Sequence, residues 1–311
     1  MERMIKIGTR GSKLALWQAN FVAEKLNSKG MKTSIITIET KGDKILNQPF
    51  AEIGSKGIFT EEIESKLLSG EVDIAVHSAK DLQSSLADEL EILAFTEREK
   101  PNDVVVSLHP QFNLKDKSKN WVLGTSSARR RAILQTNYPH LEYVEARGNL
   151  QTRFRKLEEG KFDAMILAYA GIHRMGYDHT IKELLSTEEF IPAVGQGSIA
   201  IESFKGLEEG LRKSIFDTLD HSATHYCISA ERSFLRTMEG GCSIPIFGLA
   251  ILDDEILTLK GGVAAPDGTG IIIDIVSGHP FNAESIGVEL ANKIIEKGGK
   301  KIIEKFRKKV D

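Results

Sequence analysis

The sequence is poor in cysteine and has no apolar run long enough to cross a membrane. Its two cysteines, Cys227 and Cys242, form no Cys-x-x-Cys pair. This usage is typical of a reducing compartment and gives no zinc framework. A membrane helix needs ~20 apolar residues, and a phosphate-binding G-x-x-x-x-G-K-[ST] loop is also missing. We therefore expect a cytoplasmic protein that binds no membrane.

Neither sign of charge is in large excess. Lys and Arg number 41, Asp and Glu 44, and the net charge is -3. Such a balance argues against a nucleic-acid partner for the whole chain, so any basic cluster serves a local purpose. His221 and His225 are spaced i, i+4, but no carboxylate lies between them, which favours exposed helix histidines over a metal site. The 311 residues are enough for two or three domains.

A run of arginines stands where a helix is predicted to begin. In the segment 121–135, WVLGTSSARRRAILQ, a short strand ends at Gly124 and three N-cap residues follow. The arginines Arg129, Arg130 and Arg131 then crowd the first turn, where the helix dipole disfavours cations by up to ~1 kcal/mol each. A solvated basic face accounts for one of them but not for three. Backbone N–H groups, hydroxyls and guanidinium groups would all suit a bound anion, so the segment predicts an anion site.

Strands and helices alternate over the first two-thirds of the chain, and polar loops follow the strands. Alternation of this kind predicts a parallel sheet whose ligands bind beyond the carboxyl ends of the strands. Five loops occupy equivalent positions, at Arg10, Asp43, Asp81, Thr125 and Arg147. Residues 195–200 match G-x-G-x-x-A, but the segment 198–202 has a strand pattern and no helix opens there, which argues against a dinucleotide site.

The pattern changes after His221. A helix ends at Gly240-Gly241-Cys242, and strands at 247–252, 256–260 and 271–277 predict an antiparallel meander followed by two helices. Residues 221–311 are therefore expected to form a separate α+β domain.

Two residues, a carboxylate and a thiol, are candidates for a direct role in a reaction. Asp81 is a carboxylate at a strand end among basic loops, suited to acid–base work or to stabilising a cation, or else to capping the next turn. Cys242 follows two glycines on a loop, where a backbone can approach a ligand closely, and is either a functional thiol or a buried spectator. Cys227 lies among apolar helix residues and is expected in a core.

Seven segments resemble the porphobilinogen deaminases, also called hydroxymethylbilane synthases, in the order usual for that family. They cover nearly the whole chain: TRGSKLALWQ, AVHSAKDL, LGTSSARRRAIL, ARGNLQTRFRKL, ILAYAGIHRMG, PAVGQGSIAIE and ERSFLRTMEGGCSIPI. The resemblance implies an α/β protein of three domains: residues 1–98 with 198–217, residues 103–193 and residues 221–311. Two of them resemble type II periplasmic binding proteins around a cleft, and the third is the C-terminal α+β domain.

The resemblance also implies an activity. Four porphobilinogen molecules would be condensed head to tail into linear hydroxymethylbilane with release of ammonia, in tetrapyrrole biosynthesis. A dipyrromethane cofactor would be attached through a thioether to Cys242, with no metal, and the enzyme would act as a monomer. Asp81 would be the catalytic carboxylate. The residues implied for binding carboxylates or lining the cleft are Arg10, Ser12, Lys80, Thr125, Ser127, Arg129, Arg130, Arg147, Arg153 and Gln196, with Asp43, Lys56 and Arg174.

This chemistry agrees with the residues. Each porphobilinogen brings two carboxylates, so a growing chain needs many guanidinium groups. Departure of ammonia leaves a cation that suits one well-placed carboxylate. A competing hypothesis is a non-catalytic anion-binding module of the two-domain type, in which Cys242 has no role.

Three positions depart from the family's usual pattern. Gln83 replaces a proline, which loosens the loop after Asp81. Glu61 stands where many members have lysine, which reverses one charge near residues 54–59. Lys41 replaces an arginine before Gly42, which exchanges a guanidinium for a point charge.

Overall fold

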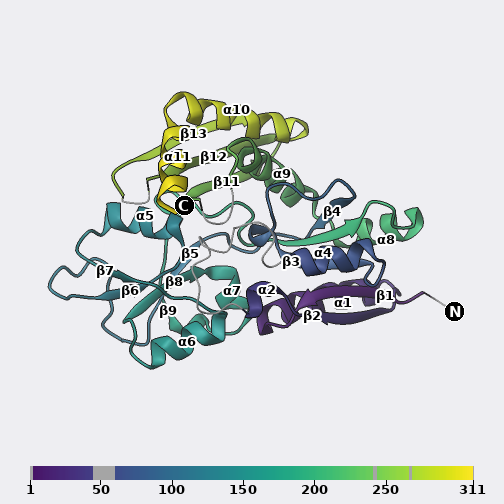
Figure 1. Cartoon of the computed structure of the whole chain (residues 1–311), viewed down its shortest axis with the longest axis horizontal. Helices are drawn as coiled ribbons and strands as arrows, with labels where there is room; N and C mark the ends of the chain where they lie inside the picture. Colours follow the sequence, from purple (N-terminus) through teal and green to yellow (C-terminus); the bar gives the residue numbers. More distant parts are fainter. Residues whose placement is uncertain (1–2, 45–59, 241–243, 266–267, 311) are drawn as a thin grey trace.

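The computed structural model describes residues 3–44, 60–240, 244–265 and 268–310, and for residues 43, 44 and 306–310 it describes the backbone alone. Three lobes each have their own sheet, two of five strands and one of three (Figure 1). The N-terminal lobe lies at the right of the figure, the central lobe at the left and the C-terminal lobe above both. The expected α/β class with a C-terminal α+β part is confirmed. Within the described ranges, no helix combines the length and apolar character that crossing a membrane requires.

The N-terminal lobe has a mixed sheet of order β2-β1-β3-β10-β4. β1 (Ile5–Arg10) pairs in parallel with β2 (Thr33–Ile38) and β3 (Ile74–Ser78), while β10 (Ile199–Phe204) runs antiparallel between β3 and β4 (Leu90–Phe95). The helical segments are α1 (Lys13–Ser28), α2 (Lys41–Lys44), α4 (Glu61–Leu68), the 3-10 turn η1 (Ala79–Asp81) and α8 (Glu209–Leu219). The apolar stripe of α1 joins strand residues in one buried core.

The central lobe repeats this topology with the order β7-β6-β8-β5-β9. β6 (Val122–Gly124) pairs in parallel with β7 (Glu142–Val144) and β8 (Ala164–Ala168), while β5 (Asp103–Val106) runs antiparallel between β8 and β9 (Ile181–Leu184). Its helical segments are α5 (Ala128–Asn137), α6 (Leu150–Glu158), α7 (Tyr169–Arg174) and the 3-10 turn η2 (Asp178–Thr180).

The expectation of a wholly parallel sheet is wrong for one strand in each lobe. The chain crosses from the N-terminal sheet to the central sheet at residues 96–102 and makes its return crossing at residues 185–198. β5 and β10, the strands that follow these crossings, each insert antiparallel between two strands. Residue periodicity indicates that a segment is a strand but contains no information on its direction. The reversal brings the first residue of β5, Asp103, opposite the last residue of β8, Ala168. The start of β5 therefore lies at the same edge as the carboxyl ends of the parallel strands.

The C-terminal lobe is the predicted antiparallel meander. β12 (Ile256–Ala264) pairs with β11 (Ile246–Asp253) on one side and β13 (Ile271–Gly278) on the other. Its helical segments are α9 (Ser222–Thr237), the 3-10 turn η3 (Pro280–Asn282), α10 (Ala283–Glu296) and α11 (Gly299–Val310). Cys227 lies in this lobe's core, as expected, and burial raises the pKa of its thiol to about 11.

A buried carboxylate connects the three lobes where the chain crosses between them. Glu231 of α9 is fully buried and pairs with Arg98 at 2.5 Å. It also accepts hydrogen bonds from the backbone N–H of Gly195, at 2.7 Å, and of Ala250, at 2.8 Å. The residues of both crossings and the first strand of the C-terminal lobe are thereby held together.

Candidate active site

The arginine-rich helix start forms as the sequence predicts. Thr125 follows β6, and Ser127 caps α5 by accepting a hydrogen bond from the backbone N–H of Arg130 at 3.4 Å. Gly124 is required by packing, because a Cβ at this position would lie 2.9 Å from the ring of Phe162. Sequence periodicity and capping chemistry therefore identified this element correctly.

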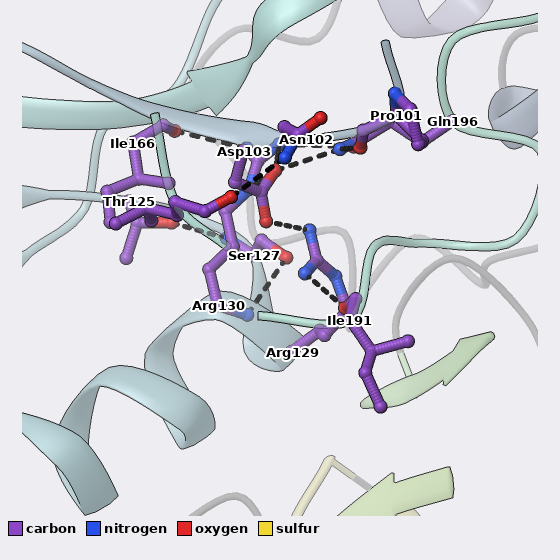
Figure 2. A network of polar contacts seen from close by, with 11 residues as sticks. Pro101, Asn102, Asp103, Thr125, Ser127, Arg129, Arg130, Ile166, Ile191 and Gln196 are labelled. Atoms are coloured by element: carbon purple, nitrogen blue, oxygen red, sulfur yellow. Dashed lines mark hydrogen bonds and ion pairs between the residues drawn. The ribbon is translucent and has the colours of Figure 1, made fainter. Parts of the chain in front are cut away.

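Arg129 and Arg130 turn inward, whereas Arg131 is exposed. The two inward side chains share one carboxylate: Arg129 Nη2 lies 2.7 Å from Asp103 Oδ2, and Arg130 Nη2 lies 2.8 Å from Asp103 Oδ1 (Figure 2). Burial by itself would raise the pKa of Asp103, but the two guanidinium groups hold it below its usual value. Part of the charge conflict at this helix start is thus resolved by an anion of the chain itself. Sequence reasoning missed Asp103, because only the reversed direction of β5 brings it here.

Gln196 joins the same cluster from the chain's return crossing. Its Nε2 donates to Asp103 Oδ1 at 2.9 Å and to the carbonyl of Pro101 at 2.7 Å, and its Oε1 accepts from Arg130 Nη2 at 3.3 Å (Figure 2). Its neighbour Gly195 has a positive φ of 74°, and a Cβ there would lie 2.9 Å from the carbonyl carbon of Ala79. The return crossing therefore packs directly on η1.

Lys80 and Asp81 reach this region from the N-terminal lobe at the end of β3. Burial lowers the pKa of Lys80 to about 8, with Arg129 and Arg130 acting in the same direction and Asp81 and Asp103 opposing it. Asp81 is exposed. It is the last residue of η1 and is followed by extended backbone, so it caps no helix. The charges of the two lobes thus act on one another around Lys80.

Arg147 and Arg153 come from the loop after β7 and from α6. Arg147 pairs with Glu145. Arg153 Nε donates to the carbonyl of Gly148 at 2.8 Å. Burial lowers the pKa of Arg153 to about 10, with Arg130 acting in the same direction and Asp81 opposing it. The structure therefore brings Arg153 close to charges from both lobes.

Arg10, Ser12 and Arg174 lie on the N-terminal side or cross to it. Arg10 ends β1, whose neighbour β3 runs parallel to it, and Ser12 caps α1 by accepting from the backbone N–H of Ala15 at 3.2 Å. Arg174 Nη2 donates to the carbonyl of Gly197 at 2.7 Å, and its guanidinium carbon lies 5.5 Å from the Trp17 ring centroid. A residue of the central lobe thus contacts both the return crossing and α1.

Three expected residues cannot be placed. Cys242 and Lys56 lie outside the described residues, as does the side chain of Asp43.

The two histidines spaced i, i+4 have other partners. His225 Nδ1 lies 2.8 Å from Asp220, and His221 caps α9. Within the described part of the chain, no group of three or more His, Cys, Asp or Glu side chains is arranged to hold a metal ion.

Two of the departures from the family's pattern contact each other. Lys41 Nζ lies 2.9 Å from Glu61 Oε2, so the reversed charge at position 61 is paired with the point charge at 41. Gln83 donates to Thr60 Oγ1 at 3.2 Å and to Glu64 Oε1 at 3.4 Å, so its amide links the η1 loop to α4.

The fold and site define a class: an α/β protein of two like lobes with polar groups gathered at facing strand ends, plus a third lobe. Among solved structures, a substrate-binding domain of a putative amino acid ABC transporter from Streptococcus pneumoniae is similar, with a TM-score of 0.45, 13% identity and coverage of 70% of this chain and 91% of that one. Residues 5–211 match the family described as "Porphobilinogen deaminase, dipyromethane cofactor binding domain", and residues 225–296 match "Porphobilinogen deaminase, C-terminal domain". The chain belongs to the porphobilinogen deaminase family.

Relatives named porphobilinogen deaminase match over nearly the full length. The relative from Cytophaga hutchinsonii is 53% identical over 308 residues, covering 99% of this chain and 98% of that protein. The relative from Desulfosudis oleivorans is 48% identical, covering 98% of each. Family membership confirms the expected transferase of tetrapyrrole biosynthesis and its dipyrromethane cofactor, so the competing hypothesis of a non-catalytic module is wrong.

Proposed function

We propose that the facing strand ends of the N-terminal and central lobes are where this chain condenses four porphobilinogen molecules into hydroxymethylbilane. One observation carries the proposal. Lys80 and Asp81 of one lobe share an electrostatic environment with Arg129 and Arg130 of the other, in a chain of this family. Cations surrounding one exposed carboxylate suit a substrate that is polyanionic and becomes cationic at its reacting carbon.

The donor chemistry fits a cofactor made of carboxylated pyrroles. Arg129 Nε and the hydroxyl of Ser126 are buried and have no hydrogen-bond partner within the described ranges, so donors remain for a ligand. We assign carboxylate binding to Arg10, Arg129, Arg130, Arg147 and Arg153, and the lining of the cleft to Ser12, Lys80, Thr125, Ser127 and Gln196, with Asp43, Lys56 and Arg174 as further members. The cofactor, attached through Cys242, supplies the pyrrole end from which the chain is extended.

Asp81 is assigned the chemical step. The carbon–nitrogen bond of the protonated aminomethyl group of porphobilinogen breaks, ammonia leaves with the bonding electron pair, and a delocalised cation remains on the substrate. A pyrrole carbon at the end of the bound chain then forms a bond to this cation and releases its proton. An exposed carboxylate at this point offsets that positive charge and accepts hydrogen bonds from pyrrole N–H groups. The surrounding arginines hold the carboxylate side chains of the substrate and so fix its orientation.

The arginines are expected to act as forked donors as well as charges. Arg147→Lys keeps the charge but loses bidentate geometry, and a charged hydrogen bond is worth about 1.5–3 kcal/mol. We expect turnover to fall about tenfold to a hundredfold, with shorter enzyme-bound chains accumulating in intact-mass spectra. Arg155→Lys is the matched control, because Arg155 is on α6 with its side chain 68% exposed and pairs only loosely, at 3.9 Å, with Glu159. Normal turnover by the Arg147 variant would contradict bidentate binding of a substrate carboxylate by Arg147.

Lys80 predicts a pH dependence. With a pKa of about 8, its ammonium group is charged below pH 8 and loses its charge as the pH rises through that value. Carboxylate binding should therefore weaken above pH 8 and kcat/KM should decline there. Lys80→Arg stays charged, so its decline should move to higher pH. An unchanged profile in this variant would assign the titration to another group.

We also propose the domain division 1–98 with 198–217, 103–193 and 221–311. Separate buried clusters in each lobe support it, although Phe247 and Leu249 of the C-terminal lobe pack into the core that contains Ile133 of the central lobe. We further propose that the enzyme is a cytoplasmic monomer. Light scattering of the purified protein would test the oligomeric state.

A further inference from the structure

Asp103 is the centre of the polar network at the arginine-rich helix start. It is fully buried, and each of its partners comes from a different place in the sequence or a different position on α5. Oδ1 accepts from Arg130 Nε at 3.0 Å and Nη2 at 2.8 Å, and from Gln196 Nε2 at 2.9 Å. Oδ2 lies 2.7 Å from Arg129 Nη2. One carboxylate therefore contacts three side chains that are proposed to serve the cleft.

These contacts determine which donors remain available. Arg130 donates from Nε to Asp103 and from Nη2 to both Asp103 and Gln196. Its Nη1 donates to the carbonyl of Ile166 at 3.1 Å. Arg129 Nη1 donates to the carbonyl of Ile191 at 2.9 Å, which leaves its buried Nε without an acceptor in the described part of the chain. A guanidinium group has five N–H donors in one rigid plane. Fixing some of them to Asp103 therefore fixes the direction of the rest.

The charges of Arg129, Arg130 and Asp103 also indicate that Asp103 orients the two arginines. Two buried guanidinium groups face one buried carboxylate, so the group keeps one positive charge at the edge where Lys80 and Asp81 lie. Without Asp103 the two cations would repel each other and would lose the one acceptor that they share, leaving each with only its carbonyl contact and, for Arg130, Gln196.

We infer that Asp103 is a positioning residue of the condensation reaction: it orients Arg129 and Arg130 so that their remaining N–H donors meet the carboxylates of the bound pyrrole chain. Gln196, whose two side-chain N–H groups are taken by Asp103 and Pro101, supports this arrangement by accepting from Arg130. The inference rests on the proposed function of the cleft. Asp103 touches neither substrate nor reacting atoms, and it acts through the arginines. The same contacts would exist if it only stabilised the fold, so the test needs a measurement that stability alone does not change.

The experiment compares Asp103→Asn and Asp103→Glu with the wild-type holoenzyme. Asn keeps the size but removes the charge, whereas Glu keeps the charge but displaces it by a methylene group. For each variant, kcat and KM for porphobilinogen, the masses of enzyme-bound chains and the thermal midpoint are measured on folded, cofactor-loaded protein. Asp163→Asn is the matched control: Asp163 accepts from the backbone N–H of Val122 at 2.8 Å, at the start of β6 and so at the opposite edge of the same sheet.

We expect kcat per loaded molecule to fall about 10²-fold in Asp103→Asn, the loss typical of misplaced reacting groups, with bound chains shifted to shorter lengths. Asp103→Glu should recover part of the rate, and Asp163→Asn should keep all of it. Lower thermal midpoints with wild-type kcat and chain lengths in both Asp103 variants would make Asp103 purely structural and overturn the inference. Failure of both variants to fold would overturn it as well.

An Asp81→Asn arm separates this inference from the proposed function. If Asp81→Asn turns over normally, the assignment of the cleft fails, whatever Asp103 does. If Asp81→Asn is inactive and Asp103→Asn is normal, only the inference about Asp103 fails.

Discussion

Cys242→Ser is expected to give an inactive protein whose intact mass equals that of the bare polypeptide. The wild-type protein should instead carry the added mass of two linked pyrrole units. The physical reason is that serine lacks the thiolate that forms the thioether, and without the attached cofactor the growing chain has no anchor. Mass spectrometry of the denatured protein, together with a porphobilinogen consumption assay, measures both effects. A bare wild-type mass in an active preparation would contradict the attachment.

Cys227→Ser is the control for this experiment. Cys227 lies in the apolar core of the C-terminal lobe, and burial raises the pKa of its thiol to about 11, so the thiol stays protonated and is a poor nucleophile. Serine places a hydroxyl in that core, at a cost of about 1–3 kcal/mol if the hydroxyl is unsatisfied. We expect a lower thermal midpoint with the adduct and the activity retained. Loss of the adduct in this variant would move the attachment to Cys227.

Asp81→Asn is expected to abolish most turnover while leaving the fold intact. Asp81 is exposed at the end of η1 and caps no helix, so its replacement removes no buried contact. Loss of a preorganised charge at a reacting centre costs about 10²–10³ in rate, and more if the group also moves protons. Single-turnover condensation should slow by at least that factor, with a thermal midpoint close to that of the wild type.

Asp81→Glu and Asp88→Asn complete this test. Glutamate retains the charge but displaces it, so we expect partial activity with accumulating intermediates. Asp88 is an exposed carboxylate of the same lobe, and its replacement should change neither rate nor stability. If Asp81→Asn condenses porphobilinogen at nearly the wild-type rate, or unfolds many degrees lower, Asp81 is not the catalytic carboxylate.

Much of this protein could be predicted from the sequence. Period-2 and period-3.6 patterns located most strands and helices, including the meander of the C-terminal lobe. Cap chemistry placed the start of α5 among Thr125, Ser126 and Ser127, and the three adjacent arginines indicated an anion at that point. The strand pattern after Gly197 correctly excluded a dinucleotide fingerprint, because β10 begins at Ile199. These features are local, since each depends on residues within one or two turns of chain.

Only the tertiary structure decided the direction of β5 and β10, and with it the partners of the arginines. Asp103 is 27 positions from Arg130 and 93 from Gln196, and no local pattern relates them. Insertion of β5 antiparallel to β8 brings Asp103 to the edge where the parallel strands end, and the crossing before β10 does the same for Gln196. Periodicity depends on which side chains are buried, whereas strand direction and ion pairing depend on how separate lobes meet. The sequence therefore determined the elements and the family, and the packing of the two lobes determined which charges neutralise one another.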